Sequence, residues 1–161
     1  MGKVDKKLQD MGIIIPGVPK PSASYIPAVQ TGNLVYTSGQ ASKKDGILIY
    51  KGKLGKDLTV EEGYEAAKIS IINCLAVLKG HLGSLDRIKK VVKLLGFVAS
   101  TSEFDQQPYV INGASDLLIK IFGEKGRHAR SAIGTNTLPF GTPVEIEMIV
   151  EVDKREIRND K

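Results

Sequence analysis

The stretch GRHARSAIGTNTLPFGTPVEIEMIVEV, residues 126–152, decides the fold predicted for this chain. It reads as a strand, a tight connection and a second strand. Apolar residues alternate with glutamates from Val144 to Val152, the period of two that is typical of a strand with one buried face. Strands favour β-branched and apolar residues, so Arg130 in the first strand and Glu145 and Glu147 in the second need a reason. We predict that this strand pair forms both the core of the sheet and the functional site.

The alternation also predicts what covers each face of the second strand. Its apolar residues, Val144, Ile146, Met148 and Val150, should lie under helices. The opposite face carries charge although the strand looks central. Self-association would turn that face toward other subunits and a shared, hydrated interior, so we expect an oligomer.

The first third of the chain predicts a helix and a hairpin. Val4, Leu8 and Met11 recur at helical spacing and Gly12 can end that turn. An irregular crossing with several prolines follows. The strand-like runs 25–30 and 34–40 flank Thr31-Gly32-Asn33, which is typical of a β-hairpin. The second run ends in Ser38-Gly39-Gln40, which leaves backbone and a hydroxyl open to a ligand, and a short edge strand is expected at 47–50.

Two long helices and a buried strand are predicted next. Thr59 and Glu62 form a capping box before an apolar stripe that ends at Gly83, and Cys74 lies on or beside that stripe as a small core residue. Residues 88–99 read as a buried strand. The second helix begins near Pro108 and ends at Gly123; Gly113 within it suggests close approach to another surface.

Together these elements predict an α+β fold in which two long helices pack on one face of a mixed sheet. The length fits one domain over residues 1–161, with an N-terminal helical extension over 1–15 and a charged tail over 154–161.

Composition narrows the class of protein. The net charge of +5 permits an anionic substrate or nucleic acid but is also typical of an ordinary solvated surface. A single cysteine rules out an intramolecular disulfide and suits a reducing compartment. The charged N-terminus has no signal-peptide pattern, and no apolar run is long enough to span a membrane. We expect a cytoplasmic protein with no membrane partner.

Several kinds of chemistry find little support. Two histidines and one cysteine, without ligand spacing, predict no metal site. Neither glycine-rich phosphate-binding motif occurs, and the serines lack a nucleophile-elbow context. Arg130 remains as a candidate binding residue, because a guanidinium can bind a carboxylate through two parallel hydrogen bonds. From the residues alone, an internal ion pair with Glu145 or Glu147 is equally plausible.

Several blocks resemble one known family. TSGQ at 37–40, NGASDLL at 112–118, HARSAIG at 128–134 and LPFGTPVEIE at 138–147 are similar to the RidA (YjgF) family, also called L-PSP endoribonuclease-like, and to its chorismate-mutase-like subgroup. The resemblance covers nearly all of residues 13–152. It implies a chorismate-mutase-like fold, a homotrimer with clefts between subunits, and hydrolysis of enamine/imine intermediates to 2-keto acids and ammonia. That reaction needs no cofactor.

The resemblance also implies roles for individual residues: Arg130 as the carboxylate clamp, Glu145 as the water or proton handler, and Tyr25, Ser38 with Gly39, and Asn112 as substrate-binding residues. It implies a substrate-binding position for Ala132 too, where the family usually has a cysteine, and this departure bears on rate or substrate range. His128 is expected to be solvated or adjacent to substrate rather than a general base.

Two alternatives remain at this level. Some relatives are described as endoribonucleases acting on single-stranded RNA, although no aromatic stacking platform or histidine pair is evident here. The other alternative is a trimer that binds small carboxylates without turnover, and the absence of the family cysteine at Ala132 is compatible with it.

Overall fold

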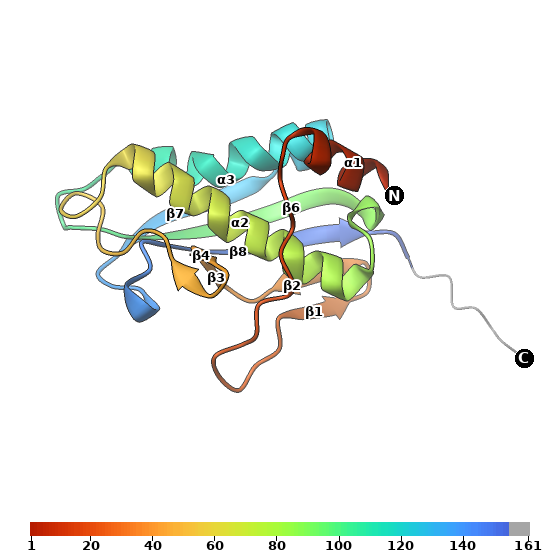
Figure 1. The fold of residues 1–161 in the computed structure, drawn as a ribbon, viewed down its shortest axis with the longest axis horizontal. Coiled ribbons are helices and arrows are strands. Elements are labelled where there is room, and N and C mark those ends of the chain that lie inside the picture. The colour runs from red at the N-terminus through yellow and green to blue at the C-terminus, as the bar shows by residue number, and fades with distance from the viewer. Residues whose placement is uncertain (155–161) are drawn as a thin grey trace, which may run out of the picture.

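The computed structural model describes residues 1–154, so nearly all of the charged tail expected at 154–161 lies outside the described residues. One mixed sheet dominates, with strand order β1-β2-β8-β6-β7 (Figure 1). Its strands are β1 (Ala28–Thr31), β2 (Leu34–Thr37), β8 (Val144–Val152), β6 (Ile88–Ala99) and β7 (Ala129–Thr135), and β3 (Gln40–Ala41) also pairs with β8. Only β6 and β7 are parallel neighbours among these pairs. Separately, β4 (Lys43–Lys44) and β5 (Ile47–Leu48) form a small two-stranded sheet.

The central strand β8 has the two faces that its alternation predicts. Val144, Ile146, Met148, Val150 and Val152 are buried, and the residues between them are only partly buried. The buried face packs on the helices because a sheet must hide its apolar side against another layer.

The prediction that the two strands of residues 126–152 pair with each other is wrong. β7 and β8 follow one another along the chain but are not neighbours in the sheet, because β6 lies between them. The helix between β6 and β7 makes a crossover that returns β7 parallel to β6, on its free edge. The connection 136–143 then passes the end of β6 and enters β8 on its other side.

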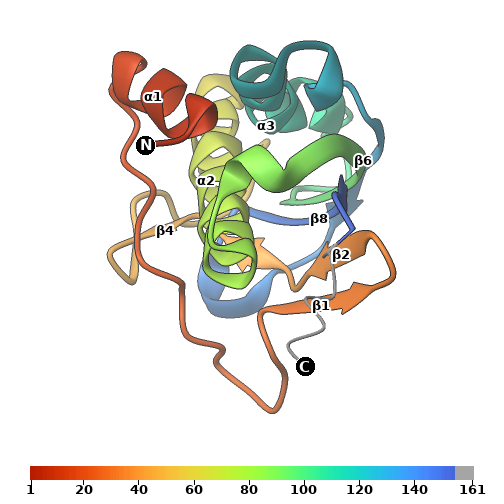
Figure 2. The same ribbon diagram turned by 90° about the vertical axis from the view of Figure 1, so that its right-hand side faces the viewer.

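Helices α2 (Val60–Leu82) and α3 (Gln107–Phe122) lie on the same side of the sheet (Figure 2). The predicted capping box is confirmed: the Thr59 backbone N–H donates to Glu62 at 2.8 Å, and the Glu62 backbone N–H donates to the Thr59 hydroxyl at 3.2 Å. Cys74 is fully buried on α2, and burial raises the pKa of its thiol to about 12, as suits a core residue. Within residues 1–154 no helix is long and apolar enough to cross a membrane.

The glycine inside α3 marks the contact between the two helices. A Cβ on Gly113 would collide with the backbone carbonyl of Tyr64 on α2. The close approach expected from the sequence is therefore confirmed, and it brings two helix backbones together.

We expect Gly113→Ala to lower the free energy of unfolding by about 2 kcal/mol, because the added methyl forces two packed helices apart. Urea unfolding measures this loss. Gly17→Ala is the matched control, since a Cβ there meets nothing within 4 Å. Equal stability of the two variants would contradict the close contact.

The N-terminal segment is anchored to the helix layer before it crosses to the hairpin. α1 (Lys3–Asp10) occupies the first part of the expected extension and ends before Gly12. Asp5 forms an ion pair with Lys79 of α2 at 2.7 Å, and Leu8 is buried. Residues 12–27 then descend past α2 to β1 as an extended crossing (Figures 1 and 2). This crossing also forms one wall of a surface pocket.

Candidate functional site

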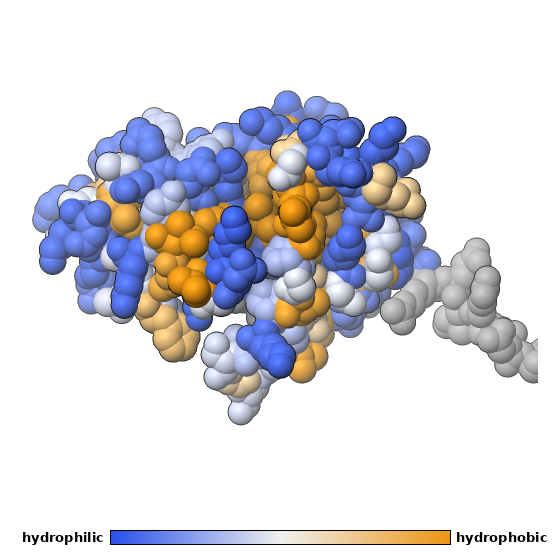
Figure 3. Space-filling model, viewed as in Figure 1, coloured by the Kyte–Doolittle hydropathy of each residue, from blue (hydrophilic) through white to orange (hydrophobic). Residues whose placement is uncertain are grey.

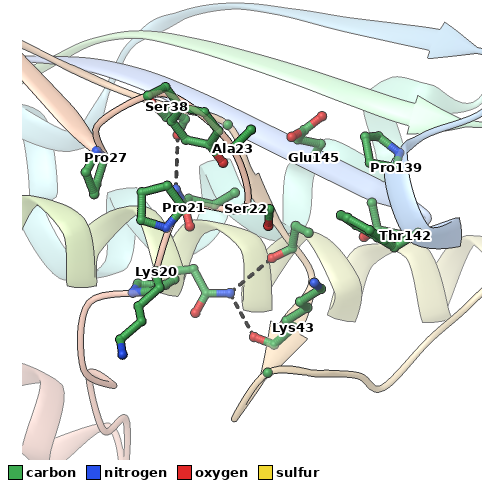
Figure 4. A pocket seen from close by; sticks show the side chains of 18 of the residues that line it. Lys20, Pro21, Ser22, Ala23, Pro27, Ser38, Lys43, Pro139, Thr142 and Glu145 are labelled. Atoms are coloured by element: carbon green, nitrogen blue, oxygen red, sulfur yellow. Dashed lines mark hydrogen bonds between the residues drawn. The ribbon is translucent and has the colours of Figure 1, made fainter.

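A pocket of about 950 Å³ opens between the crossing and the turn that precedes β8. The surface is notched between these two segments in the space-filling view (Figure 3). Figure 4 shows Pro27, Ala23 and Ser38 on one side of Glu145, with Pro139 and Thr142 on the other. Of the predicted site residues, the pocket brings together Tyr25, Ser38, Gly39 and Glu145.

Two carboxylates of β8 lie in this pocket. Glu145 and Glu147 point to the face of the sheet that the helices leave uncovered. Burial raises the pKa of the Glu145 carboxyl above its usual range, and the charge of Glu147 raises it further. Glu145 is thus a carboxylate that holds a proton more readily than an exposed glutamate, as a proton-transfer group at neutral pH should.

Gly39 makes room for that carboxylate. A Cβ on Gly39 would lie 2.8 Å from Oε1 and 3.0 Å from Cδ of Glu145. The missing side chain therefore lets the Glu145 carboxylate rest against the backbone that joins β2 to β3.

The Ser38 hydroxyl ties the hairpin to the crossing. It donates to the carbonyl of Ile26 at 2.7 Å, and the Ser38 N–H donates to the carbonyl of Pro27 at 2.8 Å. Ser38 thus shapes the pocket wall, while its oxygen keeps the capacity to accept a hydrogen bond. Tyr25 lines the same wall and is 47% exposed.

Arg130 lies elsewhere, on the edge strand β7. Its Nη1 donates to the Ser115 hydroxyl at 3.0 Å and its Nη2 to the carbonyl of Pro108 at 3.1 Å, both on α3. Burial lowers the pKa of the guanidinium, while the charge of Asp116 opposes the shift. No ion pair involves Arg130 within the described part of the chain. The helix therefore orients a guanidinium that keeps further N–H donors for a ligand.

His128 is half-buried and supports Arg130 through Ser115, so its side chain is not freely solvated, whereas its adjacency to substrate stays a prediction. Its Nδ1 is 2.6 Å from the carbonyl of Gly126 and its Nε2 is 2.9 Å from the Ser115 hydroxyl. A carbonyl can only accept, so Nδ1 donates to Gly126. Burial lowers the pKa of His128; the Gly126 hydrogen bond raises it and the charge of Arg130 lowers it. A neutral His128 can then accept from Ser115, whose oxygen accepts from Arg130.

Asn112 and Ala132 lie on the same side as Arg130. Asn112 is half-buried and sits one turn after Pro108 and three residues before Ser115, on one stripe of α3. Ala132 follows Arg130 by two residues, so both point to the same face of β7.

The predicted site residues thus form two groups on opposite faces of the sheet. Arg130 is in register with Leu94, which pairs with Met148 on the helix-covered face. Glu145 is in register with Phe97 on the uncovered face. An internal ion pair between Arg130 and Glu145 or Glu147, one alternative from the sequence, is absent from residues 1–154.

Comparison with known proteins shows the family of this chain. Residues 5–152 match the family model described as "YjgF/chorismate_mutase-like, putative endoribonuclease". The chain belongs to the YjgF family. The resemblance drawn from the sequence blocks is confirmed, and the mixed sheet with helices on one face is the YjgF/chorismate-mutase-like fold.

Relatives of this YjgF-family chain carry different descriptions. Protein TCP17 of Trypanosoma cruzi is 44% identical over 94% of this chain and 96% of its own. A Dermatophagoides farinae protein named 2-iminobutanoate/2-iminopropanoate deaminase is 30% identical over 88% of this chain and 95% of its own. The solved structure of a Shewanella oneidensis protein described as a putative endoribonuclease superposes with a TM-score of 0.91, at 34% identity, covering 94% of this chain and 100% of its own. The family thus includes an imine deaminase and members described as endoribonucleases.

Sequence reasoning missed two groups that hold Arg130. These are the Ser115 hydroxyl and the Pro108 carbonyl. The spacing of Pro108, Asn112 and Ser115 places them on one stripe of the helix and could have indicated the serine. The Pro108 carbonyl could not be predicted, because every residue has a backbone carbonyl. No cluster of three potential metal ligands occurs among residues 1–154.

Proposed function

We propose that this protein is a hydrolytic deaminase that converts 2-imino acids and their enamine tautomers to 2-keto acids and ammonia, in clefts between the subunits of a homotrimer. The observation that carries the proposal is Arg130. Its guanidinium is oriented by Ser115 and Pro108 and forms no ion pair within residues 1–154. Such a group suits the carboxylate that every 2-imino acid carries.

The two-faced arrangement supports clefts between subunits. Arg130, Asn112 and Ala132 lie toward α3, whereas Tyr25, Ser38, Gly39 and Glu145 line the pocket at the uncovered face. One substrate molecule could contact both groups if the β7 edge of one subunit met the pocket of another. The uncovered face also exposes Val29, Tyr36 and Ile133, which association would bury.

The reaction then needs only groups of this chain and water. Arg130 holds the substrate carboxylate. Glu145, as carboxylate, accepts a proton from water while the water oxygen bonds to the imine carbon, and it passes that proton to the nitrogen to give a carbinolamine. Glu145 then accepts the proton of the carbinolamine hydroxyl as the C=O bond forms and the C–N bond breaks, and it delivers this proton to the departing nitrogen, which leaves as ammonia. The imine carbon is already electrophilic, so no covalent nucleophile is required.

A relative and the histidines support hydrolysis over RNA cleavage. The Dermatophagoides farinae relative is named as an imine deaminase. Neither histidine lines the pocket: His81 is bound to Gln30 at 3.1 Å and His128 to Ser115 and Gly126. A histidine pair for acid–base cleavage of RNA is therefore not assembled within this chain.

The test is the rate of keto-acid formation from imines generated in situ by an amino-acid oxidase, with and without the protein. Acceleration is expected, together with a solution mass of three subunits. An unchanged rate with every imine would reject the deaminase. In that case, tight binding of a 2-keto acid would indicate a non-catalytic carboxylate-binding protein, and RNA cleavage lost with Arg130→Ala would indicate the endoribonuclease.

The two glutamates predict a pH effect. Glu147→Gln removes one of the two causes that raise the pKa of Glu145, so that pKa should fall. Because the carboxylate form of Glu145 is the active one, kcat/KM rises as pH passes this pKa from below. We expect this rising limb of the kcat/KM profile against pH to move to lower pH in Glu147→Gln. Glu151→Gln, on the same face of β8 but outside the pocket, should leave it in place.

A further inference from the structure

The turn before β8 holds an aromatic residue in an unusual backbone conformation. Phe140 has φ +62° and ψ 8°, in the left-handed region that bulky residues rarely adopt. The side chain is 66% exposed and lines the pocket. Asp45, the other non-glycine residue with positive φ in residues 1–154, has a short polar side chain that suits this region. Phe140 has no such local compensation, so its strain and exposure point to a role at the site.

One face of the Phe140 ring is already occupied by a cation. Nζ of Lys43 lies 4.6 Å from the ring centroid, a cation–π distance. This contact orients the ring from the β4 side. The rest of the exposed ring remains available to a ligand.

The opposite wall of the pocket is largely apolar and also includes Lys20 and Ser22. It is formed by the crossing, with Pro19, Pro21, Ala23 and Pro27, and the exposed ring of Tyr25 lies beside them. Figure 4 shows Pro27 and Ala23 across Glu145 from Pro139, the neighbour of Phe140. Proline rings lose little conformational entropy when they contact a ligand. The two walls therefore offer apolar side chains on either side of Glu145, the proposed proton handler.

The size of the pocket favours a ligand with a large side chain. Pockets of about 300–1,000 Å³ hold drug-sized ligands, and this one is at the upper end of that range. A three- or four-carbon imino acid would fill only a small part of it, and in the proposed trimer the β7 edge of a neighbouring subunit would fill another part.

The geometry points to a side-chain subsite in which Phe140 and the proline-lined crossing bind an aromatic ring, so that the preferred substrates are 2-imino acids derived from aromatic amino acids. This inference rests on the proposed deaminase function. The ring of the substrate stacks against Phe140 and its imine carbon faces Glu145, while its carboxylate is held by Arg130 on the β7 edge of a neighbouring subunit. Aromatic stacking and burial of the ring favour such a substrate over the imine of alanine.

The experiment compares imines generated in situ from phenylalanine and from alanine, with wild type, Phe140→Gly and Phe140→Tyr. Glycine removes the ring and also relieves the positive φ, so the turn keeps its conformation. We expect wild type to prefer the phenylalanine-derived imine. Phe140→Gly should lose about tenfold in kcat/KM with that imine, mainly through a higher KM, and less than about twofold with the alanine-derived imine. Phe140→Tyr should retain the preference.

Two results would overturn the subsite and leave the deaminase proposal intact. One is a wild type that hydrolyses the alanine-derived imine as well as the aromatic one. The other is an equal loss with both imines in Phe140→Gly. A wild type that accelerates neither reaction would reject the deaminase itself, and the subsite with it.

Discussion

Replacing Arg130 with alanine is expected to lower kcat/KM for imine hydrolysis by about 100- to 1,000-fold, because truncating one partner of a charged hydrogen-bonded pair costs roughly 3–4 kcal/mol. The substrate carboxylate would lose its counter-charge and its fixed orientation together. Steady-state keto-acid formation measures the loss. Arg130→Lys should recover only a small part of it, because an ammonium lacks the planar fork that binds a carboxylate through two parallel bonds.

The matched control for this experiment lies three residues earlier in the chain. Arg127 is 68% exposed and pairs with Glu124 at 3.1 Å, away from the pocket. Arg127→Ala removes the same charge and should keep full activity. Circular dichroism and solution mass should be unchanged in both alanine variants. Equal activity of wild type and Arg130→Ala would reject Arg130 as the carboxylate clamp.

Replacing Glu145 with glutamine is expected to lower kcat by about 10²–10⁴-fold, the usual contribution of a positioned acid–base group. Glutamine keeps the size of the side chain and its place against Gly39 but cannot take a proton from water. The KM should change little, because Arg130 supplies the carboxylate contact. Glu151→Gln is the control on the same strand and should be active. A Glu145→Gln variant with wild-type kcat would exclude Glu145 from proton transfer.

The same variant should be as stable as wild type or more so at neutral pH. The pKa of Glu145 is raised in the folded protein, so the folded state favours the protonated form. Ionisation of Glu145 therefore opposes folding, and this cost grows as pH rises through the unfolded and then the folded pKa. Glutamine resembles the protonated form and avoids the cost. The stability difference between Glu145→Gln and wild type should be largest at pH 7 and vanish below the unfolded pKa.

Much of the fold was predictable from local signals. Thr59 and Glu62 mark the start of α2 and Gly83 its end, because capping and left-handed glycine depend on neighbouring residues only. The alternation along β8 predicted its buried face for the same reason. Strand neighbours were harder: β7 and β8 are consecutive in sequence, yet β6 separates them. That outcome depends on how the α3 crossover packs, which is a long-range property.

The candidate site was predicted in part. Sequence blocks singled out Arg130, Glu145, Ser38 and Gly39, and one alternative paired Arg130 with Glu145 or Glu147 on a neighbouring strand. The structure places Arg130 and Glu145 on opposite faces of the sheet, so the two side chains do not meet within one chain. The strained Phe140 escaped notice because a backbone angle cannot be read from a residue name.

The stretch from 126 to 152 determines by itself that a basic strand and an alternating acidic strand exist, and that the acidic strand buries its apolar side. These are properties of residue type and period, which act over a few positions. Only the tertiary structure decides that Ser115 and Pro108 of α3 accept hydrogen bonds from Arg130. It also decides that the proline-rich crossing lines the same pocket as Glu145. Both depend on segments far apart in the chain that packing of the sheet against the helices brings together.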